Sequence, residues 1–274
     1  MLIRSIFIGA ILIIAGMAPV FGQPVNNIQR ASLSQADTDR ILRKTLEHER
    51  EFRDALTGYV FFRSATISII GLGGQITGTY RRDSNMALTP EGKRIERISY
   101  FPVATTPPGF VTTEDLEDLG GVNPFALEPS MFDQYNFTFV GKEKIDELNL
   151  YVFDVSPKVM PDAKKTKLRY FTGRIWIDDA DLMIVKTKGK AVPETKENKF
   201  PVVETWRENV DGKYWFPSFA SSDDELVFDN GAVVKLRFRV KFKDYAVGHT
   251  DVQVLDDETV VEPEPTPSPT PKKP

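Results

Sequence analysis

The sequence contains no cysteine and only two histidines, His48 and His249. The absence of cysteine excludes disulfides, thiolate catalysis and cysteine-ligated zinc or iron–sulfur sites. Two histidines are too few for a histidine-rich metal site. The chain also lacks a Gly-x-Ser-x-Gly nucleophile elbow and a Gly-Lys-Ser phosphate loop. We therefore expect no metal, no cofactor and no enzymatic activity, although chemistry by carboxylates alone stays formally open.

An excess of positive charge is absent as well, because the formal net charge is −4. A mildly acidic chain has no overall electrostatic attraction to nucleic acid, so we predict no nucleic-acid partner. Hydrophobic residues make up 41% of the 274 positions and include 19 Phe and 3 Trp. This composition is sufficient for the core of one β domain, which we expect to be a monomer.

The N-terminal residues have the pattern of a secretion signal. Arg4 precedes an apolar run over 6–18, which Pro19 ends, and small residues before Gln23 fit cleavage after position 22. The apolar run is shorter than the ~20 residues that a membrane span needs. We predict a cleaved signal peptide over 1–22 and a periplasmic or other extracytoplasmic location. An uncleaved N-terminal helix acting as an anchor is the alternative.

A flexible leader is predicted over 23–33, followed by one amphipathic helix. Ser34 is a good helix N-cap, and the helix is expected to end near Gly58. Its apolar positions fall on one stripe: Ile41, Leu42, Leu46, Phe52 and Leu56.

After Gly58 the hydrophobic period changes from helical to alternating, which is typical of strands. Turn pairs such as Asp211-Gly212 indicate hairpins. The expected strand segments are 59–69, 76–82, 94–101, 135–139, 150–155, 168–178, 182–188, 202–207, 214–219, 225–228 and 233–245. The sequence thus predicts a mainly β (α+β) class: a curved antiparallel sheet or half-open β-barrel, covered by the N-terminal helix.

A long connection between strands is expected over 102–129. It is predicted to contain a short helix at 113–119, which would be a second cover for the sheet. The predicted domain covers 34–250. Residues 251–274 are first acidic and then contain proline at every second position from 263 to 271. This composition predicts a disordered, proline-rich tail.

Two sequence segments within the predicted strands are similar to segments of a known group of proteins. These are GRIWIDDADLMIVK at 173–186 and ETWRENVDGKYWFPS at 204–218. Together with the order of a helix and then a curved meander, they resemble the bacterial outer-membrane lipoprotein-sorting superfamily, which includes LolA, LolB and the RseB-type periplasmic sensors. The resemblance covers 34–248.

The resemblance implies a half-open barrel closed by helices, an apolar cavity for acyl chains and no enzymatic activity. No segment matches a family ligand-contact motif closely enough to transfer residue roles. The stretch 121–127 is a conceivable equivalent of the family's membrane-inserting loop.

Alternating apolar residues are the candidates for lining such a cavity, and plain core packing is the alternative for each. The candidates are Tyr135, Phe137, Phe139, Ile175, Trp176, Ile177, Leu236, Phe238, Val240 and Phe242. The other face of the last strand is basic: Lys235, Arg237, Arg239, Lys241 and Lys243. This basic face could bind anionic headgroups or a charged partner, or it could pair with acidic residues on the neighbouring strand.

These observations predict an exported, non-catalytic carrier or binding protein for an acyl chain, a lipid or a lipoprotein. The alternative is a sensor or protein-interaction module of the cell envelope that holds no lipid. The two predictions differ in the partner, which is a lipid or lipoprotein acyl chain in the first and an envelope protein in the second.

Overall fold

A computed structural model describes residues 27–89, 94–108, 110–111, 133–165, 169–196 and 198–248. The predicted signal peptide, the predicted helix at 113–119, the stretch 121–127 and the predicted tail lie outside these residues. No helix within the described ranges is long and apolar enough to cross a membrane.

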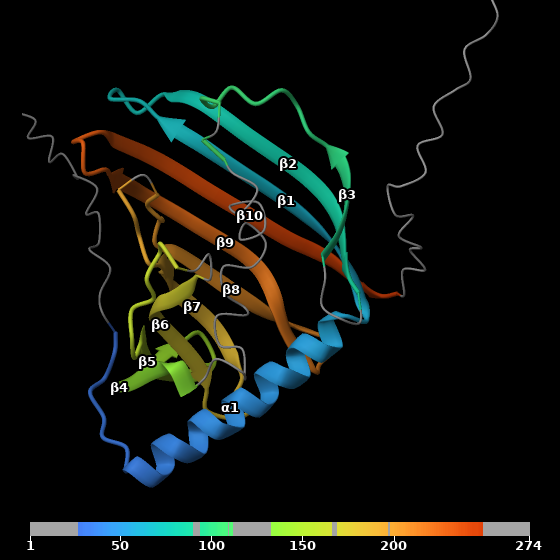
Figure 1. Cartoon of the computed structure of the whole chain (residues 1–274). Coiled ribbons are helices and arrows are strands. Elements are labelled where there is room, and N and C mark those ends of the chain that lie inside the picture. Colours follow the sequence, from blue (N-terminus) through green and yellow to red (C-terminus); the bar gives the residue numbers. More distant parts are fainter. Residues whose placement is uncertain are drawn as a thin grey trace, which may run out of the picture.

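The described chain forms one ten-stranded sheet in which every neighbouring pair is antiparallel. The strand order is β3-β2-β1-β10-β9-β8-β7-β6-β5-β4, so the sheet is open, with β3 and β4 as its edges (Figure 1). The strands are β1 (Tyr59–Ile70), β2 (Ile76–Leu88), β3 (Arg94–Tyr100), β4 (Tyr135–Ile145), β5 (Leu148–Pro157), β6 (Tyr170–Asp178), β7 (Ile184–Val192), β8 (Val203–Val210), β9 (Tyr214–Val227) and β10 (Val233–Val247). The predicted fold class is therefore confirmed.

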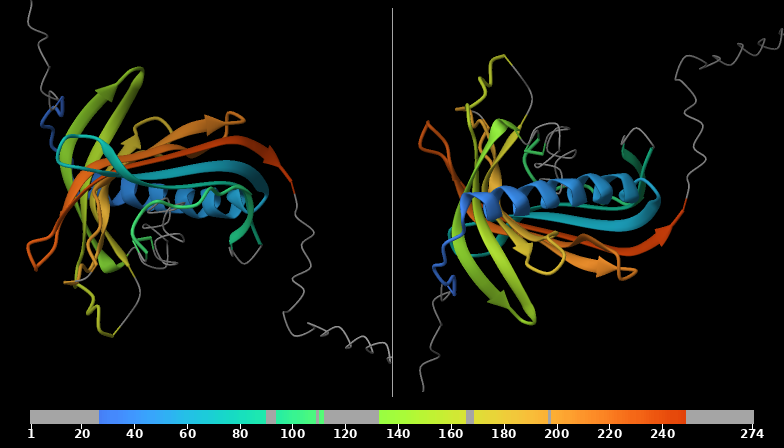
Figure 2. Two further views of the ribbon diagram at one scale, coloured as in Figure 1. Left: turned by 90° about the horizontal axis from the view of Figure 1, so that it is seen from above. Right: turned by 90° about the horizontal axis from the view of Figure 1, so that it is seen from below.

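Helix α1 (Gln35–Leu56) forms where the sequence predicts it. The Ser34 hydroxyl caps it by accepting a hydrogen bond from the Asp37 backbone N–H at 3.1 Å. Figure 2 shows that the sheet is strongly bent and that α1 runs along one of its faces. We call this the helix-side face.

Several predicted strand boundaries are wrong: β2 and β4, for example, continue to Leu88 and Ile145, and two further differences have a clear cause. The predicted segments 214–219 and 225–228 form a single strand, β9, because its acidic residues stay in register with β10. Asp223, which falls between the two predicted segments, lies opposite Arg237 and binds it. The predicted return strand from Leu182 begins instead at Ile184, since Leu182 adopts a left-handed backbone with a φ of 56°.

The end of the predicted leader extends one sheet edge. Gln29 exchanges backbone hydrogen bonds of 2.7 and 2.9 Å with Lys142 of β4. The neighbouring residue, Ile28, packs against the face of the sheet that α1 does not cover. Part of the chain before α1 therefore covers apolar side chains that β4 to β7 present on that face.

Candidate binding face

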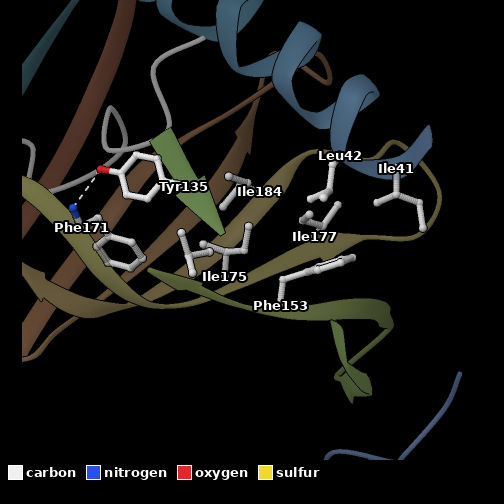
Figure 3. Packing of buried hydrophobic residues seen from close by; sticks show 9 residues of the cluster. Ile41, Leu42, Tyr135, Phe153, Phe171, Ile175, Ile177 and Ile184 are labelled. Atoms are coloured by element: carbon white, nitrogen blue, oxygen red, sulfur yellow. Dashed lines mark hydrogen bonds between the residues drawn. The ribbon is translucent and has the colours of Figure 1, made fainter. Parts of the chain in front are cut away.

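The helix-side face has two halves with different covers. Over β4 to β7, α1 places Ile41 and Leu42 against Phe153 and Ile177 (Figure 3). The remaining buried members of this cluster are Tyr135, Val155, Phe171, Ile175 and Ile184. This half of the face is filled by side chains of the protein itself.

A hydrogen bond closes the far end of this packed half. The Tyr135 hydroxyl accepts from the Phe171 backbone N–H at 3.0 Å, as the dashed line in Figure 3 shows. Burial raises the pKa of Tyr135, although the bond to Phe171 opposes this shift. Because its hydroxyl is partnered inside the core, Tyr135 acts as a structural residue here.

A buried ion pair holds α1 to the sheet. The Arg207 guanidinium of β8 binds both carboxylate oxygens of Glu49, with distances of 2.6 and 2.9 Å. The two side chains are only 2% and 4% exposed. Arg207 also donates to the Ile184 backbone carbonyl at 3.2 Å and lies 4.5 Å from the centre of the Phe52 ring.

The sequence analysis did not predict this pair, although the position of one of its two members, Glu49, indicated burial. Glu49 falls on the helical stripe that also buries Thr45 and Phe52, so its spacing marked it as a buried carboxylate. Nothing in the sequence indicated which distant cation would pair with it.

The other half of the face spans β2, β1, β10, β9 and the start of β8, and we call it the apolar half-face. Its buried residues are Ala65, Ile67, Tyr80, Val203, Ala220, Leu236, Phe238, Val240 and Phe242. Ala104, Phe110 and Val111 of the segment after β3 pack against them. Within the described residues α1 contributes nothing to this cluster, so its cover differs from that of the first half.

The structure separates the predicted cavity residues into three places. Tyr135, Phe137, Phe139, Ile175 and Ile177 lie in the half packed by α1. Leu236, Phe238, Val240 and Phe242 lie on the apolar half-face.

Trp176 lies on the opposite face of the sheet from the other predicted cavity residues of β6. Adjacent strand residues point to opposite faces, so Trp176 cannot share a face with Ile175 and Ile177. Its indole N–H donates to Glu143 at 2.7 Å, and its ring lies 4.7 Å from the Lys186 ammonium.

The basic face of β10 is largely paired with acidic neighbours on β9. Lys235 lies 3.3 Å from Glu225, and Arg237 donates to Asp223 at 2.8 Å. Arg239 also binds Asp223. These contacts favour the interpretation of this face as a set of cross-strand ion pairs.

The carboxylates at 178–181 form a turn. The Asp178 carboxylate accepts hydrogen bonds of 3.2 Å from the backbone N–H groups of Ala180 and Asp181. Burial raises the pKa of Asp178, with smaller contributions from the charges of Asp181 and Asp179. No group of three or more His, Asp or Glu in the described ranges is placed to hold a metal ion.

No protein-family model and no curated protein matches this sequence. Solved structures do match, at low identity. One is a DUF1329 family protein from Desulfovibrio piger, with a TM-score of 0.41 and 14% identity over 78% of this chain and 95% of that one. A LolA superfamily protein from Nitrosomonas europaea matches with a TM-score of 0.36 and 14% identity over 77% and 94%. MucB matches with a TM-score of 0.27 and 11% identity over 76% and 94%.

The three matches have TM-scores of 0.27–0.41 and identities of 11–14%, so they carry no argument about what this chain does. The function must be argued from the residues of the chain itself.

Proposed function

We propose that this protein is a non-catalytic, extracytoplasmic binding or carrier protein for an acyl chain, a lipid or a lipoprotein. The supporting observation is the apolar half-face. Its aromatic and branched side chains form an apolar surface over five strands, and the described cover on it is a short irregular segment containing Phe110 and Val111. An acyl chain that replaced this cover would bury its methylene groups there.

The energies make such an exchange feasible. Each methylene removed from water contributes about 0.8 kcal/mol, so a chain of about ten methylenes gains about 8 kcal/mol. Part of this gain offsets the displaced contacts of Phe110 and Val111 and the ordering of the ligand. The first half of the face offers no comparable exchange, because the Glu49–Arg207 pair and a packed core hold α1 in place.

Two measurements test the proposal. Native mass spectrometry of gently purified protein should show added masses of lipid size. Calorimetric titration with laurate should show binding that strengthens about fivefold in Phe110→Ala, since the variant removes a ring that competes for the same surface.

Phe62→Ala is the matched control, because Phe62 lies on the opposite face, where the Lys243 ammonium is 5.0 Å from its ring. It should leave the affinity for laurate unchanged. A protein that is free of lipid in every preparation and does not bind laurate would contradict the proposal. That result would favour the alternative of an envelope sensor or interaction module.

A further inference from the structure

A cluster of charged residues borders the apolar half-face on β1, β2 and β3, at the end of the sheet far from β4 (Figure 1). We call Arg63, Arg82 and Glu96 the arginine cluster. Arg63 of β1 lies directly opposite Phe242 of β10, and Ala65, two positions along β1, belongs to the apolar half-face. The same side of the sheet therefore carries the apolar half-face and, at its margin, buried positive charge.

Glu96 is the shared acceptor of the cluster. Its Oε1 accepts from Arg63 Nη2 at 2.6 Å and from Arg82 Nε at 3.0 Å, and its Oε2 accepts from Arg82 Nη2 at 2.8 Å. Burial opposes ionisation of Glu96, but the hydrogen bond from Ser84 and the charges of Arg63 and Arg82 lower its pKa below the usual value. Glu96 is therefore ionised at neutral pH, and one of the two guanidinium charges stays uncompensated within the cluster.

The surroundings of Arg63 disfavour its charged form. Burial has the largest effect and lowers its pKa, the charges of Arg94 and Arg82 lower it further, and the charge and hydrogen bond of Glu96 raise it. Asp83, the next carboxylate along β2, is bound to Arg81 at 2.7 Å. It does not bind Arg63 or Arg82 in the contacts of the described residues.

Arg63 has hydrogen-bond donors that no described residue accepts. Its side chain is 1% exposed, yet its Nε and Nη1 atoms have no hydrogen-bond partner in the described structure. A buried guanidinium with unpaired N–H groups is costly unless an acceptor reaches it. Guanidinium groups bind the oxygens of phosphates and carboxylates through charge-assisted hydrogen bonds.

We propose that the arginine cluster binds the anionic head of an amphiphile, a phosphate or carboxylate oxyanion, while the acyl chain lies on the apolar half-face. This inference rests on the proposed function and specifies its ligand class. The rim of the cluster gives access, since the side chains of Arg82 and Glu96 are 17% and 16% exposed. The oxyanion takes the unpaired donors of Arg63 and balances the excess positive charge.

Calorimetric titration of the full chain with three probes tests the inference. Dodecyl phosphate carries both parts of the ligand, monolaurin carries the acyl chain with a neutral head, and inorganic phosphate carries the anion alone. The wild-type protein should bind dodecyl phosphate at least tenfold more tightly than monolaurin and should bind inorganic phosphate much more weakly than either.

Arg63→Met should remove most of the preference for dodecyl phosphate while monolaurin binding persists. Arg81→Met is the matched control: Arg81 lies one residue before Arg82, is largely exposed and binds Asp83. This variant should keep the wild-type preference. If circular dichroism shows that Arg63→Met does not fold, the affinities of the wild-type protein for the three probes still test the inference.

Equal affinities for dodecyl phosphate and monolaurin in the wild type would overturn the inference and leave the acyl-chain proposal standing. That result is expected if a buried water satisfies Arg63. Inorganic phosphate binding as tightly as dodecyl phosphate would show that the acyl chain contributes nothing to binding. That result would overturn the inference that the ligand is an amphiphile. Binding of none of the three would defeat the inference and the proposed function together.

Discussion

Glu49 occupies a position on α1 where the helical stripe otherwise buries apolar side chains and Thr45. Its partner, Arg207, is 158 positions away in the sequence and equally buried. Removing two charges from water is costly, and the cost is offset only while both partners are present with good geometry. The pair therefore fixes how α1 is seated on the sheet more than it adds net stability.

A single substitution should expose this dependence. Glu49→Gln leaves the Arg207 charge buried without its carboxylate, so we expect the free energy of unfolding to fall by about 3 kcal/mol. Urea denaturation followed by circular dichroism measures the change. Glu47→Gln, which breaks the exposed pair with Lys44, should give no measurable change and serves as the control.

The double variant Glu49→Leu/Arg207→Met should recover most of the lost stability, because neither charge is then left unpaired. If Glu49→Gln were as stable as the wild type, the pair would not hold the helix as the geometry indicates.

At the level of elements, β6 and β7 approach each other through a pair of glycines. Gly173 lies opposite Gly189, and the Phe171 ring lies over Gly189. A Cβ atom added at Gly189 would lie 2.4 Å from the Thr172 carbonyl oxygen and 2.4 Å from the Phe171 ring. The close approach lets Phe171 fill the packed half of the helix-side face without a gap in the sheet.

Gly189→Ala should therefore strain the pairing of β6 with β7. We expect thermal unfolding to show a loss of about 1–3 kcal/mol, typical of overpacking in a core. Gly248→Ala is the control, since its Cβ would meet only Val60 methyl groups at the ordinary distance of 3.4 Å. Unchanged stability in Gly189→Ala would mean that the strands can move apart at little cost.

Across the whole molecule, burial is unevenly distributed over the sheet. Strands β5, β6 and β7 bury residues on both faces: α1 packs on one side, and on the other Leu150, Val152, Trp176 and Val185 form a second buried cluster. At the opposite edge, most residues of β3 are exposed and the strand pairs only with β2. Local opening should therefore begin at β3 rather than at the centre of the sheet.

Hydrogen–deuterium exchange measured by mass spectrometry checks this gradient. Peptides that cover 94–100 should exchange at least ~10-fold faster than peptides that cover 170–178, because local opening of an edge exposes little apolar surface. Equal protection of the two strands would show that the sheet opens only as one unit.

Local patterns in the sequence determined the elements and their faces. The Ser34 cap and the apolar stripe define α1, and strict alternation along β10 assigns Leu236 to one face and Arg237 to the other. The same alternation, applied consistently, would have removed Trp176 from the cavity candidates. These features follow from the sequence because they depend on the period of a single helix or strand.

Tertiary structure alone decided which elements meet and what covers each part of the sheet. The pairing of Glu49 with Arg207 depends on how α1 packs on the bent sheet, and that of Arg63 with Glu96 depends on the register of β1, β2 and β3. The division of the helix-side face into a packed half and a half covered by a short segment has the same origin. A periodic pattern records which way a side chain points, whereas its neighbour across the interior is set by how the whole chain folds.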